Sequence, residues 1–343
     1  MDRASTSARR EDAFAALAPE ARIARIERLA SSALDRWRLG DARVALLHHR
    51  ENAVFRVDAT TGDRFALRVH RPGYQTRASV QSELAWTDAL REAGIDSPAS
   101  VVGADGERVQ EVAHTDVPDA RLCVLFRWVE GTPLAGTDTL AAFELLGTIN
   151  AKLHRHAEHW TPPPGFVRQR WDLDGMLGEH ALWGRFGDLA ALTGAERALL
   201  SRAADAVRSD LARHGTAPDR FGLIHADLMP DNVLVHAGVP QLIDFDDCGF
   251  GWFLYDLATL LLLHEGRPRH DAARQAWLRG YRGVRALDDA QLERLPALTM
   301  ARRLVVLGWL HTRRDTDVAQ AATGTLVQRT CIRAEEFLAA RIA

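Results

Sequence analysis

The spacing of hydrophobic positions predicts that the chain begins with a helix and continues as a sheet. Residues 19–38 carry apolar side chains at intervals of three to five, typical of an amphipathic helix, and Gly40 is expected to end it. The loop 58–63 has the polar, glycine-containing composition of a hairpin connection. Short apolar or alternating runs around it predict three strands, at 44–47, 53–57 and 65–69.

A second helix and further strands complete this first part. The helix is predicted at 78–93, because Gly94 and then Pro98 follow it and neither favours a continuing helix. Short apolar runs predict additional strands at 100–102, 108–112 and 122–126. The pattern up to residue 126 therefore describes a helix and then an antiparallel sheet, with one helix inserted after the third strand.

From Gly131 onward the pattern is mainly helical, apart from a short strand-like island at 222–244. Amphipathic stretches predict long helices at 138–159, 193–213, 270–283 and 288–312. We therefore expect an α+β protein in three parts. These are a helical extension at 1–39, a small sheet-containing lobe at 40–130 and a larger helical lobe at 131–343.

Composition narrows the class of protein. At roughly 150 residues per domain, the 343 residues allow about two domains. The 43 Lys and Arg residues nearly balance the 46 Asp and Glu residues, which argues against nucleic acid or an anionic membrane as a partner. The three cysteines lack C-x-x-C spacing, the N-terminus has no apolar core, and the longest apolar run is only 257–263. These features predict a soluble, cytoplasmic protein.

The segment 225–256 carries the candidate chemistry. Asp227 and Asn232 stand five positions apart in one loop, and Asp244 follows the turn at 236–240. We expect the loop and the turn to bring the three side chains to one edge of the short sheet. Phosphoryl transfer from ATP needs such a set, because one carboxylate orients or deprotonates the attacking hydroxyl while hard oxygen ligands hold Mg²⁺ against the phosphates.

The motifs of this segment resemble those of the aminoglycoside phosphotransferase/choline kinase superfamily, whose members have a protein-kinase-like fold. The motifs are H-x-D-x-x-x-x-N at 225–232, I-D-F at 243–245 and Y-D-L-A at 255–258. The first is most similar to type II homoserine kinases, and the overall pattern is also similar to bacterial stress-response kinases. The resemblance implies a bilobal fold, with a small antiparallel-sheet lobe and a larger helical lobe, and it implies ATP and Mg²⁺ as cofactors.

The resemblance also implies a role for each residue of the motifs. Asp227 is the expected catalytic base, and Asn232 and Asp244 are the expected Mg²⁺ ligands. His225 and Asp256 are expected to support the loop without touching the substrate. Aspartate and asparagine in loops often only form turns or cap helices. Here the spacing, the turn and the division into lobes all agree with phosphoryl transfer.

A basic residue of the first lobe departs from the superfamily pattern. Members carry a lysine on the third strand, which contacts the ATP phosphates and pairs with a glutamate on the next helix. Arg68 stands at that position here, and Glu83 is its expected partner. Arginine binds phosphate bidentately, but its planar fork is larger and differs in geometry from an ammonium group. The substitution therefore leaves open a weakened or inactive kinase.

The turn that is expected to cover the nucleotide phosphates also departs from the superfamily pattern. The segment 48–57 contains no glycine-rich loop, and residues 50–52 are expected to cover the phosphates instead. Asn52 matches an asparagine that recurs in small-molecule kinases of this kind.

The segment 125–131 resembles the hinge whose backbone binds adenine. This makes three of its residues candidate nucleotide contacts: Leu125, Arg127 and Val129. Candidates for the apolar surface around the base are Leu67, Leu125 and Ile243, although plain core packing explains them equally well.

Three histidines on one predicted helix, His154, His156 and His159, are expected at a solvated helix end rather than at a metal site.

For the function, the principal hypothesis is a kinase that phosphorylates a hydroxyl of a small molecule, such as an amino alcohol, an amino acid or an aminoglycoside-like compound. A Ser/Thr protein kinase of the stress-response type is one alternative. A nucleotide-binding pseudokinase, suggested by Arg68, is the other.

Overall fold

The computed structural model of the chain describes residues 14, 16–49, 51–135, 139–266 and 269–341. The chain forms two compact units, which we describe separately. The first unit consists of Met1–Gly131, Pro163–Val167 and His236–Ile243, and the second consists of Thr132–Pro162, Arg168–Val235 and Asp244–Ala343. Helices and antiparallel strands occur in both, which confirms the predicted α+β class.

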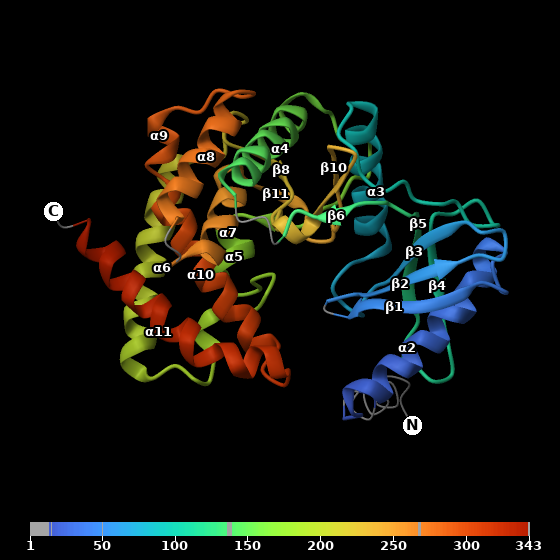
Figure 1. Cartoon of the computed structure of the whole chain (residues 1–343). Coiled ribbons are helices and arrows are strands. Elements are labelled where there is room, and N and C mark those ends of the chain that lie inside the picture. The colour runs from blue at the N-terminus through green and yellow to red at the C-terminus, as the bar shows by residue number, and fades with distance from the viewer. Residues whose placement is uncertain (1–13, 15, 50, 136–138, 267–268, 342–343) are drawn as a thin grey trace. The chain divides into compact units, whose positions relative to one another are not determined.

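The first unit is built on a five-stranded antiparallel sheet with the strand order β1-β2-β3-β5-β4 (Figure 1). The register places Arg68 of the central strand opposite Val54 on one side and Val124 on the other. The strands are β1 (Arg43–His49), β2 (Ala53–Asp58), β3 (Arg64–Val69), β4 (Val109–Val112) and β5 (Arg121–Arg127). The helices are α2 (Pro19–Ala33), the 3₁₀ turn η1 (Leu34–Trp37) and α3 (Arg77–Glu92).

The two faces of this sheet are covered by different helices. Leu29 and Leu34 at the N-terminal helix pack with Phe55, Leu67 and Leu125 in one buried cluster. Side chains alternate between faces along a strand, so Val124 lies on the opposite face, where it packs with Val80 and Leu84 of α3. Each fully buried leucine contributes about 1.5–3 kcal/mol to stability, so this alternation fixes which face of the sheet meets which helix.

Two local predictions for the first unit differ from the structure. The first helix does not end at Gly40: it tightens into η1, and Arg38 closes it in the left-handed conformation at φ 57°. The predicted strand at 100–102 forms only one bridge, between Ser100 and Phe126. A turn at Gly103, whose N–H donates to Glu107 O at 2.7 Å, takes the chain away before a second pair can form.

The second unit is mainly helical. Its long helices are α4 (Leu140–His159), α6 (Gly194–His214), α7 (Leu254–His264), α8 (His270–Arg282), α10 (Leu295–Thr312) and α11 (Asp317–Ala339). Shorter segments are α5 (Leu173–Leu177), α9 (Asp289–Leu292) and the 3₁₀ turns η2 (Phe186–Asp188) and η3 (Pro230–Asn232). The strands β6 (Thr132–Pro133) and β9 (Val233–His236) pair antiparallel, while β10 (Val239–Leu242) belongs to the first unit.

Two glycines let α4 and α8 pack side by side (Figure 1). A Cβ atom at Gly147 would lie 2.0 Å from Trp277 O, and one at Gly280 would lie 1.9 Å from Glu144 O. No larger residue fits either position without separating the helices. This close approach sets the position of the α4 side chains that reach the candidate site.

A short three-stranded sheet with the order β7-β11-β8 was not predicted, because its strands have only two to four residues and one contains two glycines. Its members are β7 (Arg170–Trp171), β8 (Phe221–Ile224) and β11 (Gly249–Trp252). Strand β11 pairs antiparallel with β8, and Gly249 lies opposite Ile224. The loop that follows β8 and the loop that precedes β11 therefore leave the sheet at the same end.

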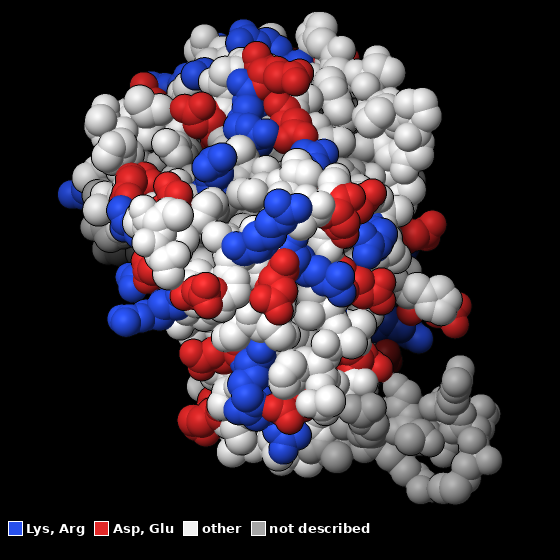
Figure 2. All heavy atoms as spheres, turned by 90° about the vertical axis from the view of Figure 1, so that its right-hand side faces the viewer, with Lys and Arg blue, Asp and Glu red and all other residues white. Residues whose placement is uncertain are grey.

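Charged side chains of both signs are interspersed on the face shown in Figure 2. Exposed arginines commonly pair with nearby carboxylates, as in Arg56 with Asp58 at 2.9 Å and Arg279 with Glu144 at 3.2 Å. Such exposed pairs contribute roughly 0–1 kcal/mol each. Among the helices that the structure describes, none combines the length and apolar character needed to cross a membrane.

Candidate active site

The loop after β8 carries Asp227 and has an unusual backbone conformation. Ala226 adopts φ 66°, in the left-handed region that costs energy for any residue with a Cβ atom. Asp256 at the start of α7 stabilises this conformation, because its Oδ1 accepts from Ala226 N–H at 2.7 Å and its Oδ2 from His225 N–H at 3.4 Å. Both contacts are buried. The Asp256 carboxylate, 30 residues later in the chain than Ala226, therefore holds the loop in this conformation.

Helix α4 supplies two further donors to the same carboxylate. Asn150 Nδ2 lies 2.9 Å and His154 Nε2 lies 3.0 Å from Asp256 Oδ2. His154 Nδ1 also lies 2.9 Å from the hydroxyl of Tyr281. Burial lowers the pKa of His154 below its ordinary value, and the neighbouring Asp256 opposes this effect only in part. We expected this histidine at a solvated helix end, but its side chain is wholly buried because α8 packs over α4.

An arginine that the sequence analysis did not identify pairs with Asp227. Arg302 of α10 places Nη2 3.0 Å from Asp227 Oδ1, and only 6% of its side chain is exposed. Its guanidinium lies over the ring of Trp183, 4.5 Å from the centroid. Burial by itself would lower the pKa of Arg302, but Tyr255 and Asp227 raise it above the ordinary value. The sequence signal that could have identified Arg302 is a pair of adjacent arginines, Arg302 and Arg303, within the otherwise apolar stretch 295–310.

Asn232 lies beside Asp227 in the same loop. Its Nδ2 donates to Asp227 O at 2.8 Å, and its own N–H donates to Met229 O at 2.9 Å in η3. The first hydrogen bond uses the amide nitrogen and does not involve the oxygen Oδ1, which is the atom of this side chain with the chemistry of a metal ligand. The structure therefore brings together Asp227 and Asn232 as the motif suggested.

Asp244 opens the loop before β11, is exposed, and adopts φ 62°. Arg168, a buried residue that the sequence analysis also missed, holds the rest of this loop. Its Nε donates to Cys248 O at 2.7 Å, and its Nη2 donates to Asp246 O at 2.6 Å. The ring of Phe245 packs on His225 with 4.6 Å between centroids, which ties the two loops to each other.

These side chains have the donor chemistry of a magnesium site. Mg²⁺ is bound in enzymes through one or two carboxylates together with substrate phosphates and water. Asp244 has a carboxylate and Asn232 an amide oxygen, both hard oxygen donors, and they belong to the two loops that leave the β7-β11-β8 sheet at the same end. In the part of the chain that the structure describes, no group of three or more His, Cys, Asp or Glu side chains is arranged to hold a metal by itself. The donor set therefore fits an ion that a phosphate helps to bind.

In the first unit, Arg68 and Glu83 form a buried ion pair. Arg68 Nη2 lies 2.7 Å from Glu83 Oε1, and the two side chains are 7% and 2% exposed. The guanidinium also lies over the ring of Phe126, 5.1 Å from its centroid. Thr76 caps the first turn of α3 by accepting from Ser79 N–H, which helps to set the position of the helix that carries Glu83.

The turn between β1 and β2 is held by its own contacts. Asn52 is buried, and its Oδ1 accepts from Arg71 N–H at 3.1 Å. Glu51 pairs with the side chain of Arg71. Arg50, which we expected to cover the nucleotide phosphates, lies outside the described residues. Asn52 thus shapes this turn, and a contact between its side chain and phosphate remains a prediction.

The predicted base-contacting residues divide into two groups. Leu67 and Leu125 are fully buried in the cluster against α2, on the sheet face opposite Arg68. Neither side chain has surface left for a nucleotide base, contrary to the expectation, because the strand alternation turns them towards the core. Arg127 is exposed, while Val129 and Ile243 are half-buried. Their contacts with nucleotide remain predictions.

Comparison with known proteins identifies the family. The model of the family described as "Phosphotransferase enzyme family" matches residues 42–294. Amicoumacin kinase from Bacillus subtilis (strain 168) is 25% identical over 304 residues, which cover 84% of this chain and 86% of that protein. A homoserine kinase from Acidiphilium cryptum (strain JF-5) is 29% identical over 289 residues, covering 79% of this chain and 82% of the relative.

A solved structure supports the same conclusion at the level of the fold. The microcompartment-associated aminopropanol kinase is 36% identical, with a TM-score of 0.83 over 91% of this chain and 98% of that one. This chain therefore belongs to the phosphotransferase enzyme family and has its kinase-like fold. The named relatives are kinases of small molecules, which favours that hypothesis over a protein kinase.

Proposed function

We propose that this protein transfers the γ-phosphoryl group of ATP to the hydroxyl of a small amino alcohol and requires Mg²⁺. The observation that carries the proposal is the pairing of Asn232 Nδ2 with Asp227 O at 2.8 Å, which keeps a carboxylate and an amide oxygen together on one anchored loop. The similarity to an aminopropanol kinase, at 36% identity over 91% of this chain, supports the choice of acceptor.

In this proposal Asp227 accepts the proton of the attacking hydroxyl. Arg302 holds one of its oxygens at 3.0 Å, which leaves the other oxygen to receive the substrate. The strained conformation at Ala226 aims the side chain, and Asp256 keeps that conformation in place through its hydrogen bond at 2.7 Å.

Asn232 and Asp244 are proposed to hold Mg²⁺. When bound, the ion neutralises phosphate charge and orients the transferred group. Arg68 is proposed to bind nucleotide phosphate, and Glu83, 2.7 Å away, fixes the direction of its guanidinium. The cytoplasmic location stays a prediction from the cysteine content and the N-terminal sequence.

A substrate panel tests the proposal. The full-length protein is incubated with Mg²⁺ and ATP together with aminopropanol, ethanolamine, homoserine, an aminoglycoside or casein, and ADP release and phosphorylated product are measured. We expect product with an amino alcohol and none with Asp227→Asn. Product with casein alone would support the protein-kinase hypothesis. Nucleotide binding without any phosphorylated product would support a pseudokinase, and either result would overturn the proposal.

A further inference from the structure

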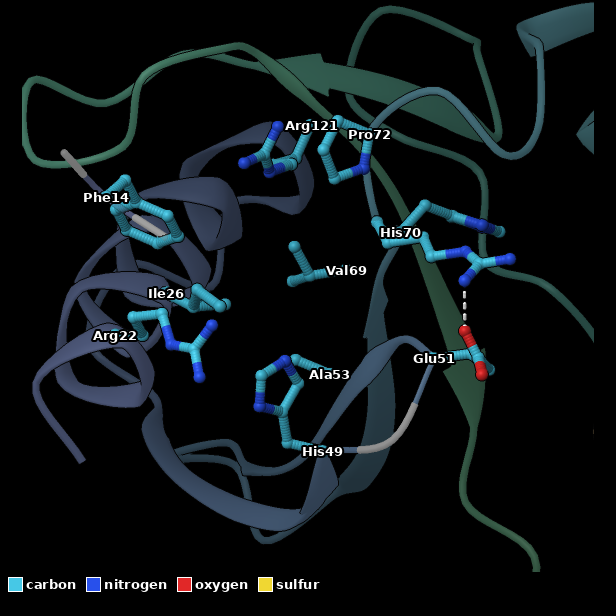
Figure 3. A pocket seen from close by; sticks show the side chains of 11 residues that line it. Phe14, Arg22, Ile26, His49, Glu51, Ala53, Val69, His70, Pro72 and Arg121 are labelled. Carbon is cyan, nitrogen blue, oxygen red and sulfur yellow. Dashed lines mark hydrogen bonds and ion pairs between the residues drawn. The ribbon is translucent and has the colours of Figure 1, made fainter. Parts of the chain in front are cut away.

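A basic cavity of about 310 Å³ lies in the first unit between α2 and the ends of β1, β2 and β3 (Figure 3). Its polar wall consists of the side chains of Arg22, His49, Glu51, His70, Arg71 and Arg121. Its apolar wall consists of Phe14, Ile26, Ala53, Val69 and Pro72. The cavity thus has cationic groups on several sides and a hydrophobic floor.

This cavity is separate from the surface that carries Arg68. Ala53 and Val69 pair in register, and both belong to the buried cluster against α2. Arg68 precedes Val69, so its side chain points to the other face of the sheet. In addition, Arg22 and Ile26 lie on α2, before residue 42 where the match to the family begins. The family match therefore does not include all the residues that form this cavity.

The charged side chains that line the cavity carry a net positive charge. Three guanidinium groups line it, and among the described lining residues Glu51 alone has a carboxylate, which already pairs with Arg71. The Nε of Arg22 is buried and has no hydrogen-bond partner among the described residues. Burial is the main cause that lowers the pKa of His49, the nearby charge of Arg22 lowers it further, and Glu51 opposes both effects. A lining with a net positive charge favours a bound anion.

We propose that this cavity binds a small organic phosphate monoester, with the phosphate on the arginines and a short apolar group on the hydrophobic floor. Guanidinium groups match the geometry of phosphate oxygens through paired N–H donors. A volume of about 310 Å³ lies at the lower end of the roughly 300–1,000 Å³ of small-molecule pockets, which suits a small organic phosphate. The site is independent of the kinase activity proposed above.

Binding of phenyl phosphate to the full-length protein, measured by isothermal titration calorimetry, tests this site. We expect saturable binding to the wild-type protein, and weaker binding of inorganic phosphate and of benzoate. Arg22→Gln should weaken phenyl phosphate binding by about tenfold or more, because it removes a charge-assisted donor. Arg28→Gln, an exposed arginine on the same helix outside the cavity, is the matched control and should bind as the wild type does.

Two further variants make the result unambiguous. Arg71→Gln removes a lining cation from a different element and should also weaken binding, which protects the test against misfolding of a single variant. The double variant Arg68→Met/Glu83→Met removes the buried ion pair without leaving Glu83 unpaired, and it should leave phenyl phosphate binding unchanged. Loss of binding in this double variant, with wild-type affinity in the Arg22 and Arg71 variants, would place the anion at the nucleotide-binding face. That result, or no saturable binding to the wild type, would overturn the inference.

Discussion

Nη2 of Arg302 lies 3.0 Å from Oδ1 of Asp227, so a buried cation from α10 holds the proposed catalytic base. The contact joins residues 75 positions apart. The same guanidinium approaches the hydroxyl of Tyr255 at 3.4 Å and lies over Trp183, and these contacts restrict its orientation. Asp227 is therefore oriented from two directions, by the loop that carries it and by a helix that packs beneath it.

We expect Arg302→Met to lower kcat by at least about tenfold, because the Asp227 carboxylate loses the donor that orients it. Arg302→Lys should recover part of the loss, since it keeps the charge but not the planar fork. The neighbouring Arg303 pairs with Glu265 instead, so Arg303→Met is a matched control and should retain kcat. Steady-state kinetics on the three variants measures this. Equal kcat in Arg302→Met and the wild type would contradict the positioning role.

Asp227→Asn should reduce turnover by about 10²–10⁴-fold, the usual contribution of a general base, while nucleotide binding is retained. ADP release and the dissociation constant for ATP are measured on the same preparation. The control is Asp231→Asn, an exposed aspartate of the same loop. ADP release close to the wild-type rate would show that another group accepts the proton.

Asp244→Asn should weaken Mg²⁺-dependent ATP binding, because it removes a carboxylate from the proposed ion site. ATP is titrated with Mg²⁺ and with EDTA, and the variant is expected to lose most of the difference between the two. Asp205→Asn, an exposed carboxylate of α6 with 77% of its side chain accessible, serves as the control. If Mg²⁺ strengthened ATP binding to Asp244→Asn as much as to the wild type, the ligand assignment would fail.

The pair Arg68–Glu83 allows stability and nucleotide binding to be measured separately. Arg68→Met should weaken ATP binding and also destabilise the protein by about 3–5 kcal/mol, because Glu83 would remain buried without its partner. The double variant Arg68→Met/Glu83→Met should recover stability but not ATP affinity. Urea unfolding and ATP titration distinguish these effects. Full ATP affinity in the double variant would refute phosphate binding by Arg68.

His154 predicts a pH dependence of stability. Its pKa is lowered in the folded protein, mainly by burial, so below about pH 6.5 the unfolded chain binds a proton that the folded protein does not. The free energy of unfolding should fall with decreasing pH in this range, by up to about 1.4 kcal/mol per pH unit for one proton. His154→Gln should reduce this slope. Urea unfolding at pH 7.5 and pH 5.5 measures it, and identical slopes in both proteins would contradict the prediction.

Local patterns predicted the strands of the first unit well, because strict alternation and short polar turns are properties of neighbouring residues. The pairing of Arg68 with Glu83 was predicted from the resemblance to the kinase superfamily, not from a local pattern, and the structure shows it. Gly40 and the run 100–102 were misassigned, because the chain satisfied its backbone hydrogen bonds elsewhere, at Arg38 and at Gly103. The faces on which Leu67 and Leu125 lie followed only from the packing of α2.

The sequence alone determined the candidate reactive set, because Asp227, Asn232 and Asp244 occur at fixed spacing around one loop and one turn. The tertiary structure decided what surrounds that set: Arg302, Arg168 and His154 come from segments with no local relation to it. Helix packing, or a strand of only two to four residues, brings each of these three side chains to the candidate site. Such contacts form only when segments distant in the sequence bury surface against each other. A short-range sequence pattern does not contain those contacts. For that reason the sequence indicated the candidate chemistry, and only the fold showed which residues support it.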